Sequence, residues 1–217
     1  MRSNEIEAYK KTLRLNDAQR SIIVGMLLGD GHLETQNGRK TFRLKVEHTA
    51  SQQFYVDWLY EQLQDWVLTP TATKQKNING KTTEHFCFQT LSVVQFRFYG
   101  LQFYDDQGKK KVPKLIRRLL TPLALAVWFM DDGSAKSKHH RALILNTHCF
   151  SRREINILQT ALHQRYQIES SIRTQKDGLQ ILITGEFARR LIEVIAPYML
   201  PDFRYKFGAL VNNLPKE

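Results

Sequence analysis

Two apolar stretches that both end in Asp-Gly decide the fold of this chain: SIIVGMLLGDG at Ser21–Gly31 and PLALAVWFMDDG at Pro122–Gly133. Each stretch is apolar on all sides, so each is expected to form a helix that is buried on most of its faces. Their last aspartates, Asp30 and Asp132, lie about a hundred positions apart. The repetition indicates that the chain contains two related halves.

The residues after each stretch repeat one order of elements. The first copy predicts strands at 32–35 and 40–48 around an Asn37-Gly38 turn, a helix at 51–67, a hairpin at 71–90 around Asn79-Gly80, and a helix at 92–102. The second predicts a basic turn at 135–141, a strand at 142–147, a helix from an N-cap at Ser151 to Tyr166, strands at 168–175 and 179–184 around Asp177-Gly178, and a helix at 186–196. We therefore expect an α+β protein with two pseudo-symmetric αββαββα halves, residues 1–102 and 122–217, and a linker at 103–121.

The charge balance indicates a polyanionic partner. The 217 residues include 32 Lys and Arg against 21 Asp and Glu, which gives a net charge of +11. A surplus of this size favours nucleic-acid binding, because each phosphate that is neutralised releases a counterion. The basic residues are scattered over strand-like stretches and do not line one amphipathic helix, so a membrane surface is the weaker interpretation.

The remaining composition is typical of an intracellular globular protein. No apolar run approaches the roughly 18 residues of a membrane span. The first residues, Met1 to Thr12, are polar and predict no secretory signal. Cys87 and Cys149 lie outside any CxxC pattern, so we expect two reduced cysteines and no zinc site.

The cores of the two stretches resemble a known motif. IVGMLLGDG at Ile23–Gly31 and LAVWFMDDG at Leu125–Gly133 resemble the nine-residue sequence that names the LAGLIDADG homing endonucleases. WFMDDG, LNT at Leu145–Thr147 and RYK at Arg204–Lys206 resemble single-chain members encoded by introns of yeast mitochondria. The resemblance covers nearly the whole chain. It implies the LAGLIDADG homing endonuclease fold, in which two antiparallel DNA-binding sheets form a saddle.

The motif helices have residues that suit close packing. The small ones are Gly25, Gly29, Ala124 and Ala126. Packing would bring Asp30 and Asp132 to the same end of the helix pair, where two carboxylates resist ionising together unless a cation lies between them. Val127 and Trp128 are bulky for such a contact. We therefore expect unequal halves that bind different DNA half-sites.

The resemblance also implies a metal site. The eighth motif position supplies the metal-binding acid, which is Asp30 in the first copy and Asp132 in the second, with the backbone of Gly29 and Asp131 as further ligands. Hard oxygen ligands suit Mg²⁺, and Mn²⁺ is expected to substitute. The Asp131 side chain, at the seventh position, is the rival for the ligand role. The alternative is that both aspartates are only helix caps.

Lysines near the metal are a further feature of the family. By similarity of the flanking residues, Lys110 in KKKVP and Lys206 in RYKFG fall at these positions. Lys109 and Lys111 are alternatives to Lys110. The triple lysine could equally be a solvated linker that touches phosphate.

DNA contacts are expected from the sheets, where alternation places polar residues on one face. For any single residue, a phosphate contact or solvation is more common than base recognition. Glu47 is a candidate for the metal pocket, whereas His32 and the His139–His140 pair are given no catalytic role. The candidates for DNA contact are Arg39, Lys40, Arg43, Lys45, Lys74, Lys76, Asn77, Arg141, Arg173 and Gln175.

Together these features predict a monomer that hydrolyses both strands of a long asymmetric DNA site, in an organelle or in the bacterial cytoplasm. The family resemblance further implies that cleavage leaves 3′ overhangs and promotes intron mobility. One alternative is an intron RNA maturase. The other is a DNA-binding regulator of the same fold without catalysis. Both motif aspartates, with a lysine available in each half, favour the enzyme over the regulator, but they do not separate cleavage from splicing.

Overall fold

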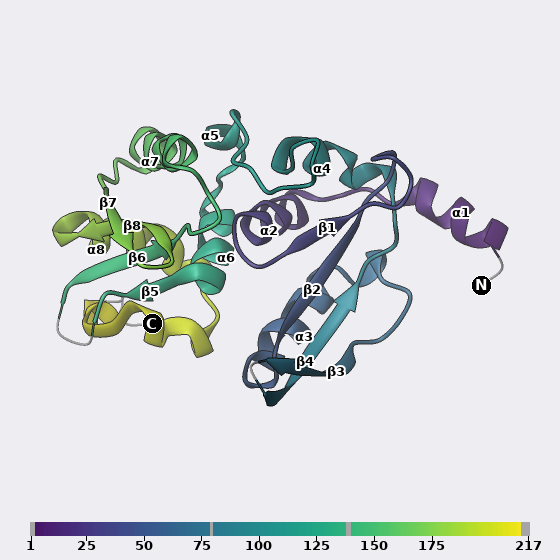
Figure 1. Cartoon of the computed structure of the whole chain (residues 1–217), viewed down its shortest axis with the longest axis horizontal. Coiled ribbons are helices and arrows are strands. Elements are labelled where there is room, and N and C mark those ends of the chain that lie inside the picture. The colour runs from purple at the N-terminus through teal and green to yellow at the C-terminus, as the bar shows by residue number, and fades with distance from the viewer. Residues whose placement is uncertain (1–2, 79, 138–139, 214–217) are drawn as a thin grey trace. The chain divides into compact units, whose positions relative to one another are not determined.

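The computed structural model of the chain describes residues 3–78, 80–137 and 140–213, so Asn79 of the second predicted turn and His139 lie outside the described residues. The chain forms two compact units. Unit 1 contains Met1–Arg20 and Asp30–Leu101, and unit 2 contains Ser21–Gly29 and Gln102–Glu217. Each unit holds one four-stranded antiparallel sheet (Figure 1).

Unit 1 is built on a sheet with strand order β1-β2-β4-β3. Apolar side chains of β2 and of α3 pack together on one face of this sheet. Its elements are α1 (Ser3–Thr12), the start of α2 (Asp17–Leu28), β1 (His32–Glu34), β2 (Arg43–Thr49), η1 (Ala50–Gln52), α3 (Gln53–Gln62), η2 (Gln64–Trp66), β3 (Ala72–Ile78), β4 (Lys81–Gln89), η3 (Val94–Phe96) and most of α4 (Arg97–Phe103).

Alternation along β2 separates the core from the polar face. Leu44, Val46 and His48 are buried, and the residues between them are partly exposed. The strand predicted to start at residue 40 begins only at Arg43, because Gly38 and Arg39 both adopt left-handed backbone with φ of 66°. The helix predicted over 51–67 is likewise divided, since α3 ends at Gln62 and the short 3₁₀ turn η2 follows.

Unit 2 repeats the same topology, with strand order β5-β6-β8-β7. Its core is formed by α6, in which every residue from Ala124 to Met130 is fully buried, as the sequence predicts. Its elements are most of α2, the end of α4, α5 (Ile116–Leu119), α6 (Pro122–Asp132), β5 (Gly133–Ala135), β6 (Ala142–Asn146), α7 (Arg152–Tyr166), β7 (Ser171–Gln175), β8 (Gly178–Thr184), α8 (Gly185–Ile195), η4 (Ala196–Tyr198) and η5 (Pro201–Asn213).

The predicted αββαββα order is confirmed in both halves: α2-β1-β2-α3-β3-β4-α4 and α6-β5-β6-α7-β7-β8-α8. The N-cap at Ser151 is also confirmed, since Ser151 and Glu154 form a complete capping box. Three elements had no strong sequence signal, namely α1, α5 and the 3₁₀ segment η5. Among the described residues, none of the helices combines the length and apolar character that a bilayer span requires.

Candidate active site

Within unit 2, the last turns of α2 pack against α6 through glycines. A Cβ atom added to Gly25 would lie 2.5 Å from the Ala124 carbonyl oxygen and 2.6 Å from Val127 Cβ, and one added to Gly29 would overlap the Asp131 carboxyl group. Such distances are too short for real Cβ atoms. Val127 therefore lies at the helix contact despite its size, because Gly25 leaves room for it.

A lysine donates a hydrogen bond to the end of each motif helix. Lys110 Nζ donates to the Gly29 carbonyl oxygen at 2.5 Å. Lys206 Nζ donates to the Asp131 carbonyl oxygen at 3.0 Å and also to that of Met130. In register with the closing Asp-Gly, Gly29 and Asp131 are equivalent positions. The two carbonyl groups that the resemblance named as metal ligands thus both accept from an ammonium group, as suits the negative end of a helix.

Lys206 is the more enclosed of the two lysines. Lys206 is only 9% exposed, and its Nζ lies 5.0 Å from the centroid of the Phe203 ring. Burial of an ammonium group requires compensation by hydrogen bonds or by an aromatic face, and Lys206 has both. Its position is therefore fixed before any substrate binds.

The neighbouring acids of α6 have different surroundings. The Asp131 carboxyl group lies against the backbone of Gly29. Asp132 lies near Cys149: partial burial raises the pKa of the Cys149 thiol, the Lys110 ammonium lowers it and the Asp132 carboxylate raises it. Asp132 and Lys110 therefore share one neighbourhood, whereas Asp131 occupies the helix contact.

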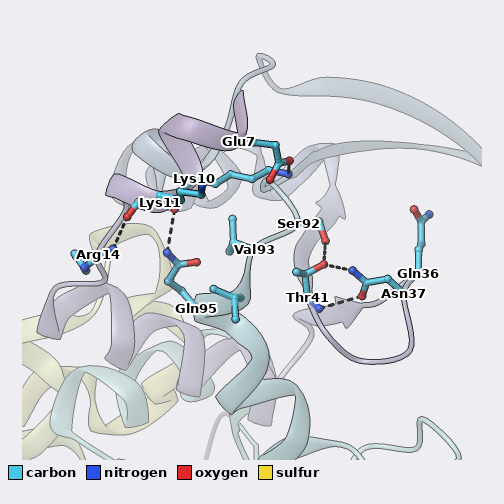
Figure 2. Close-up of a pocket in the computed structure, with 11 residues that line it drawn as sticks. Glu7, Lys10, Lys11, Arg14, Gln36, Asn37, Thr41, Ser92, Val93 and Gln95 are labelled. Carbon is cyan, nitrogen blue, oxygen red and sulfur yellow. Dashed lines mark hydrogen bonds and ion pairs between the residues drawn. The ribbon is translucent and has the colours of Figure 1, made fainter. Parts of the chain in front are cut away.

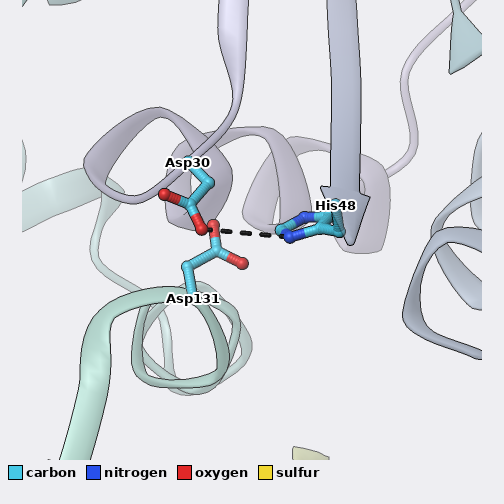
Figure 3. A group of neighbouring side chains, drawn as sticks. All are labelled: Asp30, His48 and Asp131. Carbon is cyan, nitrogen blue, oxygen red and sulfur yellow. Dashed lines mark ion pairs between the residues drawn. The ribbon is translucent and has the colours of Figure 1, made fainter. Parts of the chain in front are cut away.

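In unit 1, Asp30 lies beside a buried histidine. His48 Nδ1 is 3.9 Å from Asp30 Oδ2 (Figure 3). The His48 side chain is 5% exposed and its ring lies 5.0 Å from that of Tyr55, whereas the Asp30 side chain is 55% exposed. Asp30 and His48, both labelled in Figure 3, each offer an atom of the kind that binds divalent cations.

Asp30 and His48 line a hollow of about 460 Å³ on the polar side of the first sheet, and Glu47 lines it as well. The Glu47 carboxylate forms an ion pair with Lys76 and lies 3.2 Å from His85 Nδ1. Burial raises the pKa of Glu47, but the hydrogen bond and charge of Lys76, with His85, outweigh this and hold that pKa below its usual value. Glu47 is therefore an anion within this hollow.

Most of the proposed DNA-contacting residues of unit 1 share one sheet face. Arg43 and Lys45 on β2 contact Glu34 at 2.6 and 3.2 Å, and the hydrogen bonds from both hold the pKa of Glu34 below its usual value. Lys74 and Lys76 lie on the same face, because they pair with His85 and Thr83 of β4. Asn77 alternates to the other face.

Arg39 and Lys40 lie in the β1–β2 loop and not on a strand. Arg39 Nη2 donates to the Gly100 carbonyl oxygen at 3.3 Å, so its guanidinium group fastens this loop. Lys40 is exposed.

The corresponding face in unit 2 carries amides. Arg173 and Gln175 on β7 pair with Gln180 and Gly178 of β8, and Gln180 Nε2 donates to Asn146 Oδ1 at 2.7 Å. Arg141 is exposed directly before β6.

Sequence reasoning missed a basic cluster at the end of α1. Lys10, Lys11 and Arg14 line a hollow of about 720 Å³ in unit 1 (Figure 2). Gln95 Nε2 fixes this end of α1 by donating to the carbonyl oxygens of Lys10 and Leu13 at 3.0 and 3.1 Å. The available signal was the basic last turn of SNEIEAYKKT.

Comparison with known proteins identifies the class. The family model described as the LAGLIDADG DNA endonuclease family matches residues 20–191. The chain belongs to this family of homing endonucleases, and the family resemblance and fold predicted from the sequence are confirmed.

Particular relatives carry two kinds of name. The cytochrome b mRNA maturase bI2 of Saccharomyces cerevisiae is 32% identical over 200 residues, which is 87% of this chain but 47% of that protein. The DNA endonuclease I-ChuI of Chlamydomonas applanata is 30% identical over 209 residues, which is 89% of this chain and 96% of that one. The chain thus spans about half of the first relative and nearly all of the second.

The fold also matches a solved complex. The homing endonuclease I-WcaI bound to its DNA recognition sequence aligns with a TM-score of 0.88 and 25% identity over 94% of this chain and 92% of that one. The two pseudo-symmetric halves of this chain are therefore those of a homing endonuclease.

Proposed function

We propose that the chain is a monomeric, divalent-metal-dependent endonuclease that cuts both strands of a long, asymmetric double-stranded DNA site. One observation carries this proposal. Asp30 lies two residues after the end of α2, and Asp132 is the last residue of α6. Each follows directly after a residue, Gly29 or Asp131, whose carbonyl group accepts from Lys110 or Lys206. Two pseudo-equivalent acid–lysine pairs suit the hydrolysis of two strands. Membership of a DNA endonuclease family and the DNA-bound I-WcaI structure support it.

The donor set fits a hard divalent cation. Asp30 is more than half exposed at the edge of a polar hollow, and the charges of both Asp132 and Lys110 act on the Cys149 thiol. Carboxylate oxygens suit Mg²⁺ and Mn²⁺. When bound, such an ion would activate water and stabilise the leaving oxygen. The proposed metal-holding acids are Asp30 in the first motif copy and Asp132 in the second, with Asp131 as the rival in the second copy.

The lysines and Glu47 act on the reacting groups. Lys110 and Lys206 would hold positive charge beside the scissile phosphate, since each is positioned by a carbonyl at the helix end. Glu47, an anion in the hollow that Asp30 lines, would orient a water molecule.

The polar faces of the two sheets would contact the DNA. Arg, Lys and Gln side chains at alternate strand positions suit base edges and phosphates of the major groove. Because the first face carries charged pairs and the second carries amides beside Arg173, the two half-sites would differ. Cleavage with 3′ overhangs at an intron insertion site, in an organelle or a bacterium, would promote intron mobility.

The test is cleavage of a plasmid library that carries randomised or intron-junction targets, with Mg²⁺, with Mn²⁺ and with EDTA. We expect the wild type to linearise a subset of targets only with metal, and Asp30→Asn to bind these targets without cutting them. Tight binding with no cleavage of any target by the wild type would make the chain a DNA-binding regulator.

A second function, binding of intron RNA, is favoured by the relative named a maturase. The two functions are compatible if RNA and DNA use different surfaces. Filter binding of an intron transcript, beside the cleavage assay, separates them.

A further inference from the structure

Helices α3 and α7 occupy the same place in the two halves but have opposite charge. The sequence of α3, QFYVDWLYEQ, contains Asp57 and Glu61 and no basic residue. The sequence of α7, RREINILQTALHQRY, contains three arginines and one acid, Glu154. Glu154 accepts hydrogen bonds from Ser151 and from the Val112 N–H, which hold its carboxylate at the N-terminal end of α7. Of these two equivalent helices, only α7 is basic.

The basic residues of this surface surround a hollow of about 380 Å³ between α5 and α7. Lys114, Arg117 and Arg153 line it and are exposed. No Asp or Glu is among the described residues that line it. Its other lining residues are the apolar Ile116, Ile157 and Ala161 and the hydrogen-bonding Asn156, Thr160 and Gln164.

Hydrogen bonds between α7 and the α5 segment hold this hollow in shape. Arg165 Nη1 donates to the Arg117 carbonyl oxygen at 3.0 Å, and Tyr166 Oη donates to that of Leu120 at 2.6 Å. The Val112 N–H donates to Glu154 at 3.1 Å from the other end of α7. The surface is thus built before a ligand arrives.

The hollow faces away from the sheet of unit 2. Ile155, Leu158 and Leu162 of α7 are buried toward that sheet, while Asn156, Thr160 and Gln164 are exposed on its outer side. The layer of α7 therefore separates the hollow from the polar sheet face with Arg173 and Gln175. A DNA duplex lying on that face would not reach the hollow.

We propose that this hollow binds an unpaired nucleotide of a folded RNA, with Lys114, Arg117 and Arg153 on the flanking phosphates. A basic rim around an apolar floor with amide and hydroxyl groups suits an unstacked base and 2′-hydroxyls, which RNA loops and bulges present and duplex DNA does not. The proposal rests on the RNA-binding function above and gives it a site.

The test compares filter binding of three probes by the full chain: an RNA hairpin with an unpaired bulge, the same hairpin fully paired, and a DNA hairpin of the paired sequence. The test variant is Arg117→Glu with Arg153→Glu. The matched control is Arg189→Glu with Arg190→Glu, an equal charge change at exposed positions of α8. We expect the test variant to bind bulged RNA at least about tenfold more weakly, with a salt slope lower by about 1.4, and the control to stay within about twofold.

A second variant, Thr160→Trp, fills the hollow without a change of charge. We expect it to remove the preference for bulged over paired RNA, while cleavage of target DNA by all variants stays at the wild-type rate. Equal losses in the test and control pairs would overturn the site but leave RNA binding intact. If the wild type binds none of the RNA probes, both the proposed site and the proposed RNA-binding function are overturned. If the test variant loses DNA cleavage, the surface belongs to DNA binding instead.

Discussion

The two halves of this chain share one topology but differ in chemistry. The polar face of the first sheet is charged and internally paired, with Glu34 between Arg43 and Lys45 and Glu47 between Lys76 and His85. The face of the second carries amides, such as the Gln180–Asn146 pair, beside Arg173. Strand order and register thus come from the apolar positions, which both halves keep, while the polar positions are free to diverge. An asymmetric target is the expected result.

The largest expected effect concerns the second acid. Asp132→Asn should lower the rate of double-strand cleavage by more than about 100-fold, because it removes a carboxylate proposed to hold the metal. Loss of a residue that only supports a metal ligand typically costs about 10- to 100-fold. Asp131→Asn should lower the cleavage rate by less than about tenfold, since the Asp131 side chain lies at the helix contact. Cleavage rates at saturating DNA, with binding measured separately, check this. If Asp131→Asn had the larger effect, Asp131 would be the metal ligand, and the two motif copies would use different positions for their metal-binding acid.

At the contact between α2 and α6, Gly25 of α2 faces Val127 of α6. Adding a side chain at Gly25 should therefore destabilise the protein. Gly25→Ala places a Cβ 2.5 Å from the Ala124 carbonyl oxygen and should lower the free energy of unfolding by about 1–3 kcal/mol, or more if the helices cannot shift. Denaturant unfolding measures it. Adding Val127→Ala should recover part of the loss, whereas strict additivity of the two changes would show that these residues do not pack together.

The caps of α3 and α7 differ as well. Ser151→Ala should cost about 1 kcal/mol, because Ser151 accepts from the Glu154 N–H in a capping box. Gln52→Ala at the N-cap of α3 should cost almost nothing, since the Gln52 side chain makes no capping hydrogen bond. Thermal unfolding of both variants compares them. Equal losses would mean that the cap geometry of α7 does not contribute.

The same cap predicts a pH dependence. Burial raises the pKa of Glu154, but hydrogen bonds from Ser151 and the Val112 N–H outweigh it and hold the pKa below 4.5. A depressed pKa contributes stability above pH 4.5 that is lost as the pH falls through the folded value. Wild type should therefore unfold at a higher temperature than Glu154→Gln at pH 7, and the difference should vanish in acid. A difference that is constant with pH would contradict this.

The smallest expected effect separates the two sheets. Lys74→Ala should weaken DNA binding several-fold for all sequences and lower the salt slope by about 1, because Lys74 is exposed on the charged face. Gln175→Ala should leave the slope unchanged and relax base preference instead. Titrations of target and scrambled DNA over a salt range measure both. A slope change in Gln175→Ala would remove the contrast between the sheets.

Periodic and repeated signals allowed most of the fold to be predicted. The Asp-Gly helix ends, the strand alternation and the Ser151 cap each depend on local sequence. The α1 and α5 helices could not be predicted, because α1 is fixed by Gln95 and α5 by Arg165, both distant in sequence.

Less of the candidate site than of the fold could be predicted from the sequence. Lys110 and Lys206 were placed near the metal by resemblance alone. Their contacts with the carbonyl groups of Gly29 and Asp131 were not predicted, because those carbonyl groups were expected to bind metal. His48 alternates with Leu44 and Val46, so its position indicated the core, and only the structure shows it beside Asp30. The metal-holding roles of Asp30 and Asp132 stay predictions.

The glycine-lined end of α2 belongs to unit 2. Most of the first half of the sequence lies between this segment and α6, against which it packs. During synthesis this apolar segment leaves the ribosome long before the helix that covers it exists. The chain must therefore carry an exposed hydrophobic helix through much of its translation, a state that invites aggregation and chaperone binding. An excised N-terminal fragment would keep that segment exposed permanently, because the helix that covers it, α6, lies in the second half.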